Sequence, residues 1–245
     1  MAEIDYAARR INTLEVDKTP QLASFFNVDQ PRGAKLRNGK TAEPKYSFCL
    51  ELEPDGAVLK AVRAKIMSQA LAYAAGSGED ERAFAAVTGK TPESIAEAIR
   101  GRLIEVPISD GDKAADNSAA RGKKREWSRG LKIINARSQK PIACGIILNG
   151  GIVQLDDPGQ IKLYTPKFFY TGAKVFAEID IACGGPVGND GKPWVTAYAA
   201  SVLSPGKGEK LAGGGANLAE AFSSYVGLDS EEDPTGAAAS GDENW

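Results

Sequence analysis

The chain has 245 residues, 42% of them hydrophobic, which is enough for one large β domain or two small ones with a substantial core. It contains no histidine, and this excludes Ser-His-Asp and Cys-His catalytic sets as well as histidine-ligated zinc. The formal net charge is −2. The cysteines Cys49, Cys144 and Cys183 are widely spaced and form no CxxC pair, so we expect neither a disulfide framework nor a zinc knuckle.

Membrane and export signals are also missing from the sequence. No apolar run approaches the ~20 residues that span a bilayer, and the first residues lack the basic-then-apolar order of a signal peptide. We therefore expect a soluble, cytoplasmic protein with no membrane partner.

The first third of the chain begins with two β-leaning stretches, 10–16 and 22–28. The segment 30–44 is rich in Gly, Lys and Arg and is typical of a mobile loop. Residues 46–53 then alternate, with Phe48, Leu50 and Leu52 on one face, which predicts a strand that is covered by core on one side.

A helical insertion is predicted over about 56–101. Apolar residues recur at spacings of three and four from Leu59 to Tyr73, which indicates an amphipathic helix that ends near Gly76. A shorter helix is expected over 80–87. Thr91 as N-cap and Pro92 in the first turn predict another helix, which stops at Gly101.

Strands dominate the rest of the chain, followed by one short helix over 217–226 that begins with a capping-box-like Asn217–Glu220. This order predicts a β-barrel or a β-sandwich with a helical excursion. The expected strands are 103–108, 131–136, 144–148, 175–181 and 193–203.

Motifs for catalysis are incomplete. Gly89-Lys90-Thr91 lacks the upstream glycine of a phosphate-binding loop. Glu178 and Asp180, or Asp110 and Asp112, could supply carboxylates to a magnesium-dependent nuclease. We favour a plainer interpretation, in which Glu178 and Asp180 form the wet face of a half-buried strand and Asp110-Gly-Asp is a loop.

Positive charge is concentrated in the body of the chain. Residues 229–245 hold six acids and no Lys or Arg, so removing them from the formal charge of −2 leaves +4 on residues 1–228. Within 113–140, nine basic residues face two acids. A second cluster is opposed only by Glu43 and consists of Arg32, Lys35, Arg37, Lys40 and Lys45. Such separation favours a polyanionic partner.

Aromatic residues lie among these cations, which is the combination that single-stranded nucleic acid requires. Cations follow the phosphates, and flat rings stack on unpaired bases without selecting among them. Trp127 is our first choice for a stacking residue, whereas Phe168 and Phe169 also fit a plain core role. The predicted DNA-binding residues are Lys123, Lys124, Arg125, Trp127, Arg129, Lys132, Arg137, Tyr164, Lys167, Tyr170, Lys174 and Trp194.

Several short segments also follow one another in a recognisable order: Lys45–Leu50, Asp110–Lys113, Ile134–Ser138 with Pro141, Phe169–Val175 and Lys210–Gly215. In that order they resemble the phage single-stranded DNA-binding proteins, which have an OB-fold core and an acidic tail with an aromatic end. The resemblance covers residues 10–228 and the tail. It implies an OB-fold DNA-binding domain over 1–228, a short C-terminal helix, and a disordered acidic tail over 229–245.

The resemblance also implies a function. Such a protein coats and protects exposed strands, without catalysis or cofactor, during phage DNA replication, recombination and repair in the cytoplasm of the bacterial host. Two alternatives to it stay open besides the nuclease, namely a strand-annealing recombination protein and a structural virion protein. A homodimer and a preference for DNA or RNA are also left open by the sequence.

The acidic tail has two expected roles. Its carboxylates would compete with DNA for the basic groove, and the terminal tryptophan would anchor a replication partner such as a DNA polymerase or a helicase. The residues assigned to this tail are Asp229, Glu231, Glu232, Asp233, Asp242, Glu243 and Trp245.

Overall fold

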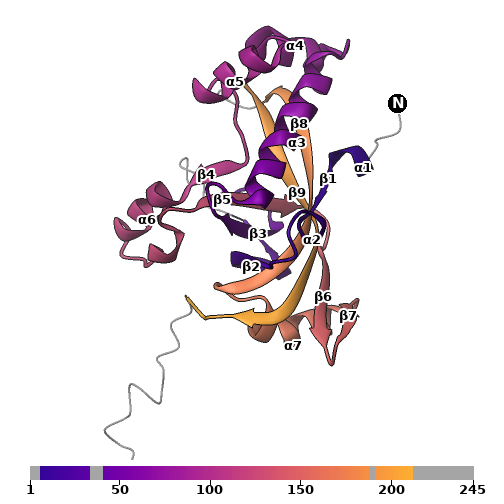
Figure 1. The fold of residues 1–245 in the computed structure, drawn as a ribbon, viewed down its shortest axis with the longest axis vertical. Coiled ribbons are helices and arrows are strands. Elements are labelled where there is room, and N and C mark those ends of the chain that lie inside the picture. Colours follow the sequence, from indigo (N-terminus) through magenta and orange to yellow (C-terminus); the bar gives the residue numbers. More distant parts are fainter. Residues whose placement is uncertain (1–5, 34–40, 188–190, 212–245) are drawn as a thin grey trace, which may run out of the picture. The chain divides into compact units, whose positions relative to one another are not determined.

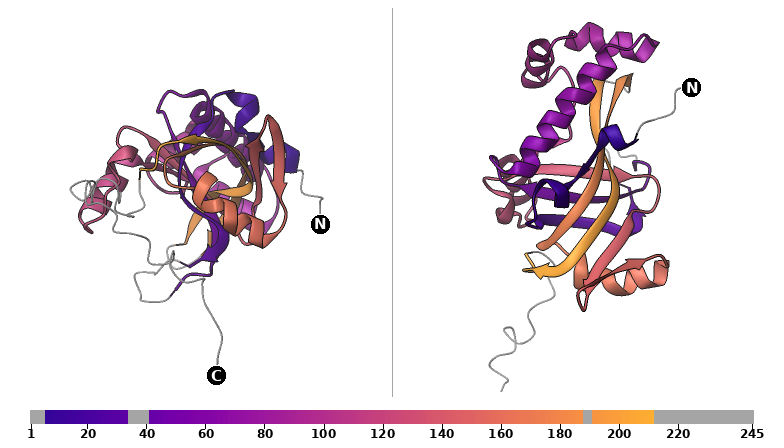
Figure 2. Two further views of the ribbon diagram at one scale, coloured as in Figure 1. Left: turned by 90° about the horizontal axis from the view of Figure 1, so that it is seen from below. Right: turned by 45° about the vertical axis from the view of Figure 1, so that its right-hand side comes forward.

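A computed structural model describes residues 6–33, 41–187 and 191–211 (Figures 1 and 2). All of them belong to one unit of the chain, Met1–Ala212. The strands of this unit are β1 (Arg10–Asn12), β2 (Gln21–Arg32), β3 (Lys45–Leu52), β4 (Ile108–Asp110), β5 (Lys132–Ser138), β6 (Ala143–Leu148), β7 (Gly151–Leu155), β8 (Ala173–Val187) and β9 (Lys192–Gly208). The helices are α1 (Tyr6–Arg9), α2 (Thr13–Val16), α3 (Ala57–Ala74), α4 (Glu79–Thr88), α5 (Pro92–Arg100), α6 (Gly111–Ala119), the 3-10 helix η1 (Glu126–Ser128) and α7 (Pro158–Phe168).

Five strands pair in a closed circuit. β2 pairs with β3, β3 with β5, β5 with β9, β9 with β8, and β8 returns to β2. The β5–β9 pairing is parallel and the other four are antiparallel. β1 is added beside β8, β4 beside β5, and the β6–β7 hairpin beside β9. The chain therefore combines one large sheet with helices, which is a more mixed composition than the mainly β fold that we predicted.

The core lies on one face of these strands because their side chains alternate. Phe48, Leu50 and Leu52 of β3 are almost completely buried, as the sequence predicts. Ile179 and Ile181 of β8 are fully buried in the same cluster. Each such side chain contributes roughly 1.5–3 kcal/mol by leaving water.

The predicted helical insertion is present as α3, α4 and α5 (Figure 1). α3 buries a stripe that includes Val62, Ile66 and Ala70, and both α3 and α4 pack against β8. The ring of Tyr73 meets that of Phe84 edge to face, which holds α3 on α4. In α5 the side chain of Thr91 accepts a hydrogen bond from the Ser94 N–H, so the predicted N-cap is confirmed.

Two strand predictions are wrong in part. The stretch 10–16 is strand only as far as Asn12, because the Asn12 side chain then caps α2 by accepting a hydrogen bond from the Leu14 N–H. In 103–108 only Ile108 belongs to a strand, β4. The residues before it are irregular, apart from an isolated bridge between Glu105 and Trp194.

Two helices were not predicted. Asp110-Gly-Asp is not a loop, because the Asp110 side chain accepts a hydrogen bond from the Lys113 N–H and caps α6. α7 begins in the same way, with Asp157 as N-cap and Pro158 in the first turn. The predicted helix 217–226, the acidic tail 229–245 and residues 34–40 of the predicted loop 30–44 lie outside the described residues, while residues 30–32 of that loop belong to β2. No helix of the described ranges is long and apolar enough to cross a membrane.

Candidate nucleic-acid interface

The outer face of the strand circuit carries a row of polar and aromatic side chains. Because Phe48 and Leu50 point into the core, the residues that alternate with them, Ser47 and Cys49, point to the opposite face. Strand register then places Arg137 and Asn135 of β5 beside these two residues. Asn27 of β2 lies across from Ser47, and Tyr198 of β9 lies across from Arg137. One row therefore crosses four strands that are distant in sequence.

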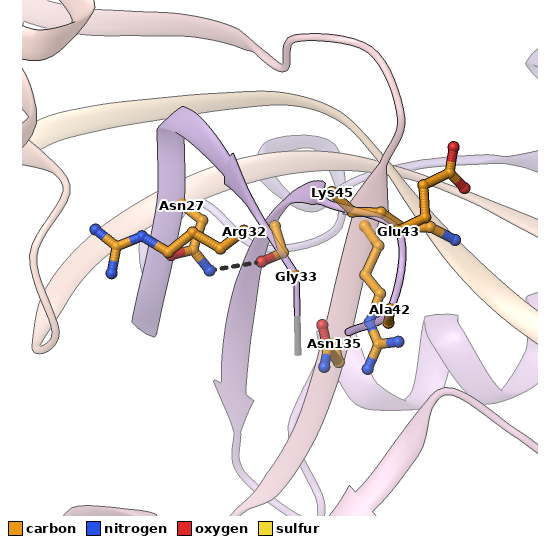
Figure 3. A pocket seen from close by; sticks show the side chains of 9 residues that line it. Asn27, Arg32, Gly33, Ala42, Glu43, Lys45 and Asn135 are labelled. Carbon is orange, nitrogen blue, oxygen red and sulfur yellow. Dashed lines mark hydrogen bonds between the residues drawn. The ribbon is translucent and has the colours of Figure 1, made fainter. Parts of the chain in front are cut away.

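Two adjacent hollows lie along this row and share Lys45 and Arg137. We call them together the strand groove. The first, about 340 Å³, opens between β2, β3 and β5 and includes Asn27, Arg32 and Asn135. The second, about 320 Å³, continues onto β9 with Trp194, Thr196 and Tyr198. Figure 3 shows Asn27, Lys45 and Asn135 around the first hollow, with the hydrogen bond of 2.9 Å that Asn27 Nδ2 donates to Ser47 Oγ.

The groove has cations that are free to meet phosphates. Arg32, Lys45 and Arg137 form no salt bridge with any other residue that the structure describes. Two acids also line it, Glu43 and Glu105, and Glu43 Oε2 accepts a hydrogen bond from Gln139. The balance is one net positive charge along the described groove.

An unpaired polar atom lies in the first hollow. Asn135 Oδ1 is buried and has no hydrogen-bond partner within the described structure. Leaving a buried acceptor unpaired costs about 1–3 kcal/mol. An N–H group of a ligand, such as an amino or imino group of a base, would remove that cost.

One end of the face carries an aromatic residue, Phe25, whose backbone conformation is strained. Phe25 has φ of 51°, unusual for a bulky residue, and lies within an irregular part of β2 between Ser24 and Asn27. The residue is nevertheless 43% exposed. The guanidinium of Arg125 lies over the ring, with 4.6 Å between Cζ and the ring centroid. We call this pair the Phe25 platform. Backbone strain of this kind persists where surrounding structure enforces it, often at binding sites.

Buried polar contacts hold the Phe25 platform in place. Arg125 forms a salt bridge of 3.2 Å with the buried carboxylate of Glu51, and Ser24 Oγ donates a hydrogen bond of 2.6 Å to the same oxygen. The Phe25 N–H donates to Thr171 Oγ1. The ring of Trp127 is 6.3 Å from that of Phe25, and its indole N–H is buried without a partner among the described residues.

The other end of the face carries two more rings. Trp194 and Tyr198 alternate with buried residues of β9, and Tyr198 is 44% exposed. Gly184 of β8 lies directly beneath the indole of Trp194, and a Cβ at that position would collide with it. The glycine therefore allows the indole to lie against the strand.

The cations that the sequence predicts to bind DNA are not equally available to a phosphate. Arg137 lies in the strand groove, but Arg125 is committed to Glu51. Arg129 contacts Asp116 and Glu126, and these hydrogen bonds raise its pKa. Lys132 Nζ lies 2.6 Å from Asp110, and this hydrogen bond holds the pKa of that carboxyl below its usual value. The charge of these three cations is therefore already compensated.

The remaining predicted residues lie elsewhere. Lys123 and Lys124 are exposed in the turn before η1. Tyr164 and Lys167 are on α7, where Tyr164 packs edge-on against Phe168. The hydroxyl of Tyr170 donates to the Gly208 carbonyl, and Lys174 is an exposed residue of β8. None of these six residues lines either hollow of the groove.

Sequence reasoning missed several groove residues. Arg32 and Lys45 were noticed only as members of a basic cluster. Asn27, Asn135 and Tyr198 were not singled out as DNA-binding residues, and neither was Phe25, which lies on the platform beside the groove. A signal for Ser47 and its neighbours did exist, since the alternation that places Phe48 in the core also specifies which residues face outward.

The carboxylates considered for a nuclease have other partners. Arg10 donates to Asp180 Oδ1 at 2.9 Å and lies 3.7 Å from Glu178. Within the described residues no group of three or more Asp, Glu or Cys side chains is placed to hold a metal ion.

Comparison with solved structures gives a clear similarity. The single-stranded DNA-binding protein from bacteriophage Enc34 matches with a TM-score of 0.52 and 18% identity, over 91% of this chain and 97% of that one. The same protein in complex with single-stranded DNA matches with a TM-score of 0.53 and 19% identity, over 86% of this chain and 97% of that one. The chain shares the fold of a phage single-stranded DNA-binding protein. No protein-family model and no curated protein sequence matches it.

Proposed function

We propose that the chain is a sequence-independent single-stranded DNA-binding protein and that the strand groove, with the Phe25 platform beside it, is its DNA-binding surface. The observation that carries the proposal is the juxtaposition of three uncompensated cations with exposed rings at both ends of one strand face. Support comes from the Enc34 protein of the same fold, whose structure has been solved in complex with single-stranded DNA.

We infer further that the five-strand circuit is an OB barrel. In chain order β3 and β5 are its second and third strands, and α7 precedes the fourth. An OB fold binds oligonucleotides on the face of its second and third strands and with the loop that joins its first two. The first hollow of the strand groove is lined in this way, because Gly33, Ala42 and Glu43 come from the connection between β2 and β3, and Arg32 is the last residue of β2.

The expected chemistry is stacking plus charge neutralisation. Each base stacked on a ring contributes roughly 1–3 kcal/mol without regard to its identity. Phe25, Trp194 and Tyr198 supply such rings. Each phosphate neutralised by Arg32, Lys45 or Arg137 adds about −0.7 to the slope of log affinity against log salt on a single strand. Duplex DNA cannot offer its paired bases to the rings.

The acidic segment has a role in the same proposal. The sequence places six carboxylates in residues 229–245, and they would act as a weak competitor for the cations of the groove. Trp245 would then anchor a replication partner such as a polymerase or a helicase. In this account the protein coats exposed strands during phage DNA replication and recombination, and it has no catalytic activity of its own.

Fluorescence anisotropy with a labelled single strand, a duplex and an RNA of equal length tests the proposal. We expect the DNA single strand to bind more tightly than the duplex and to lose affinity as salt rises. The double variant Lys45→Ala with Arg137→Ala should weaken binding, whereas Lys60→Ala, which removes an exposed cation of α3, should not. Equal binding of duplex and single strand would contradict the proposal.

A further inference from the structure

β7 lies at the edge of the sheet, where it pairs only with β6 among the described strands. The hairpin turns through Asn149 and Gly150, both with positive φ, which is the turn that suits two antiparallel strands. In Figure 1 the hairpin lies beside α7, and the two elements are in contact. None of the β7 residues lines the strand groove.

This edge exposes apolar side chains. Ile152 is 69% exposed and Val153 is 41% exposed, while Leu163 on the adjacent helix α7 is 61% exposed. No charged residue occurs in Gly151–Leu155. Natural edge strands commonly carry a lysine, a proline or a bulge that prevents further pairing. β7 has none of these and pairs with β6 in an unbroken register.

The backbone of β7 offers a specific set of unpaired groups. A two-residue turn makes its flanking residues, Leu148 and Gly151, a hydrogen-bonded pair, and such pairs alternate along an antiparallel hairpin. Val153 therefore bonds to β6, whereas Ile152 and Gln154 direct their N–H and C=O groups to the free side. Another extended strand can match this pattern of donors and acceptors.

We propose that β7 pairs with β7 of a second copy of this chain, antiparallel and centred on Val153. In this register Val153 of each copy lies opposite Val153 of the other, and Ile152 lies opposite Gln154. The residues that point to the free side thereby become the hydrogen-bonded pairs of the new ladder. Asp156 falls opposite Gly150, so like charges do not meet.

A second copy of the chain suits the free edge of β7 better than an unrelated strand does, for two reasons. The segment is uncharged, with an apolar residue at its centre, so two copies bring no like charges together. A two-fold pairing is also closed, so it yields a dimer and leaves no further edge at this site. Because β7 is separate from the groove, both copies keep their DNA-binding surfaces, and the inference does not depend on the proposed function.

Sedimentation equilibrium of the full chain tests the association. We expect wild-type protein to self-associate in the absence of DNA, and Val153→Lys to weaken the association by about tenfold or more because two charges would face each other. Leu103→Lys is the matched control, since it places the same charge at another exposed apolar position. Circular dichroism confirms that each variant is folded. A wild-type chain that stays monomeric at all concentrations would overturn the proposal.

Cysteine substitution tests the register. Val153→Cys should form an intermolecular disulfide under mild oxidation, because directly opposed residues of a non-hydrogen-bonded pair lie within disulfide reach. Ile152→Cys should cross-link far less, since its opposite residue is Gln154. The native cysteines Cys49 and Cys144 are buried and Cys183 is half-buried, so the wild-type chain under the same oxidation gives the background. Equal cross-linking of the two variants, or cross-linking only of Ile152→Cys, would overturn the proposed pairing.

Discussion

Replacement of Phe25 separates DNA binding from stability. Loss of one stacked base should cost roughly 1–3 kcal/mol, so either Phe25→Ala or Phe25→Gly should weaken single-strand binding by about 5- to 150-fold. Both variants also lose the buried part of the ring. Slightly more than half of this residue's surface is buried, which corresponds to at most about 2–3 kcal/mol of folding stability.

The two variants should differ in stability, however. Phe25 has φ of 51°, a conformation that glycine adopts freely but alanine does not. Phe25→Gly should therefore unfold with a free energy about 1 kcal/mol higher than Phe25→Ala, the reverse of the usual order for these residues. Urea denaturation measures the stabilities, and fluorescence anisotropy with a labelled oligonucleotide measures the affinities.

Two controls complete this experiment. Asn149→Gly relieves a positive φ in the β6–β7 turn, far from the groove in sequence and outside both hollows, so it should leave DNA affinity unchanged. Tyr164→Ala removes an aromatic ring of α7 that lines neither hollow and should also leave it unchanged. The reasoning fails if affinity follows stability across the variants, or if Phe25→Ala and Phe25→Gly bind DNA as tightly as wild type.

Four further predictions concern charge and ionisation. Arg137→Ala should lower affinity and make the salt slope shallower by about 0.7, while Lys60→Ala should do neither; an unchanged slope for Arg137→Ala would place that residue outside the interface. Burial raises the pKa of Cys49 to about 11 and those of Cys144 and Cys183 to about 12, so native thiols should react slowly with iodoacetamide at pH 8 and rapidly after unfolding. Because these thiols ionise in the unfolded chain before they do in the folded one, urea titrations should show stability falling as pH rises above about 9, and a flat profile would contradict the burial. Deletion of 229–245 should raise single-strand affinity, most strongly at low salt, where the Debye length is ~30 Å at 0.01 M; weaker binding would exclude the competitor role.

The regular elements could be predicted well because their signals are local. The alternation around Phe48 identifies β3, and Thr91 with Pro92 marks the start of α5. The N-terminal caps of α6 and α7 were missed although Asp110 and Asp157 are ordinary capping residues. Without a long apolar stripe after them, such residues also fit a loop or a turn.

The interface was harder to predict because it depends on register across strands. Asn27, Ser47, Arg137 and Tyr198 are neighbours only after β2, β3, β5 and β9 pair. The dense basic run around Trp127 is conspicuous in sequence, yet the structure pairs Arg125, Arg129 and Lys132 with acids. Composition thus indicated the class of ligand, while the uncompensated cations could be identified only from the tertiary contacts.

Photo-cross-linking of a halogenated single-stranded oligonucleotide, followed by mass spectrometry of the adducts, tests the central claim most directly. Cross-linking by a base requires its close contact with a side chain, so it locates the interface without any substitution. We predict adducts on Phe25, Trp194 or Tyr198, suppressed by an excess of unlabelled single strand and not by duplex. Adducts confined to Tyr164 or Tyr170, which lie outside the strand groove, would contradict the account.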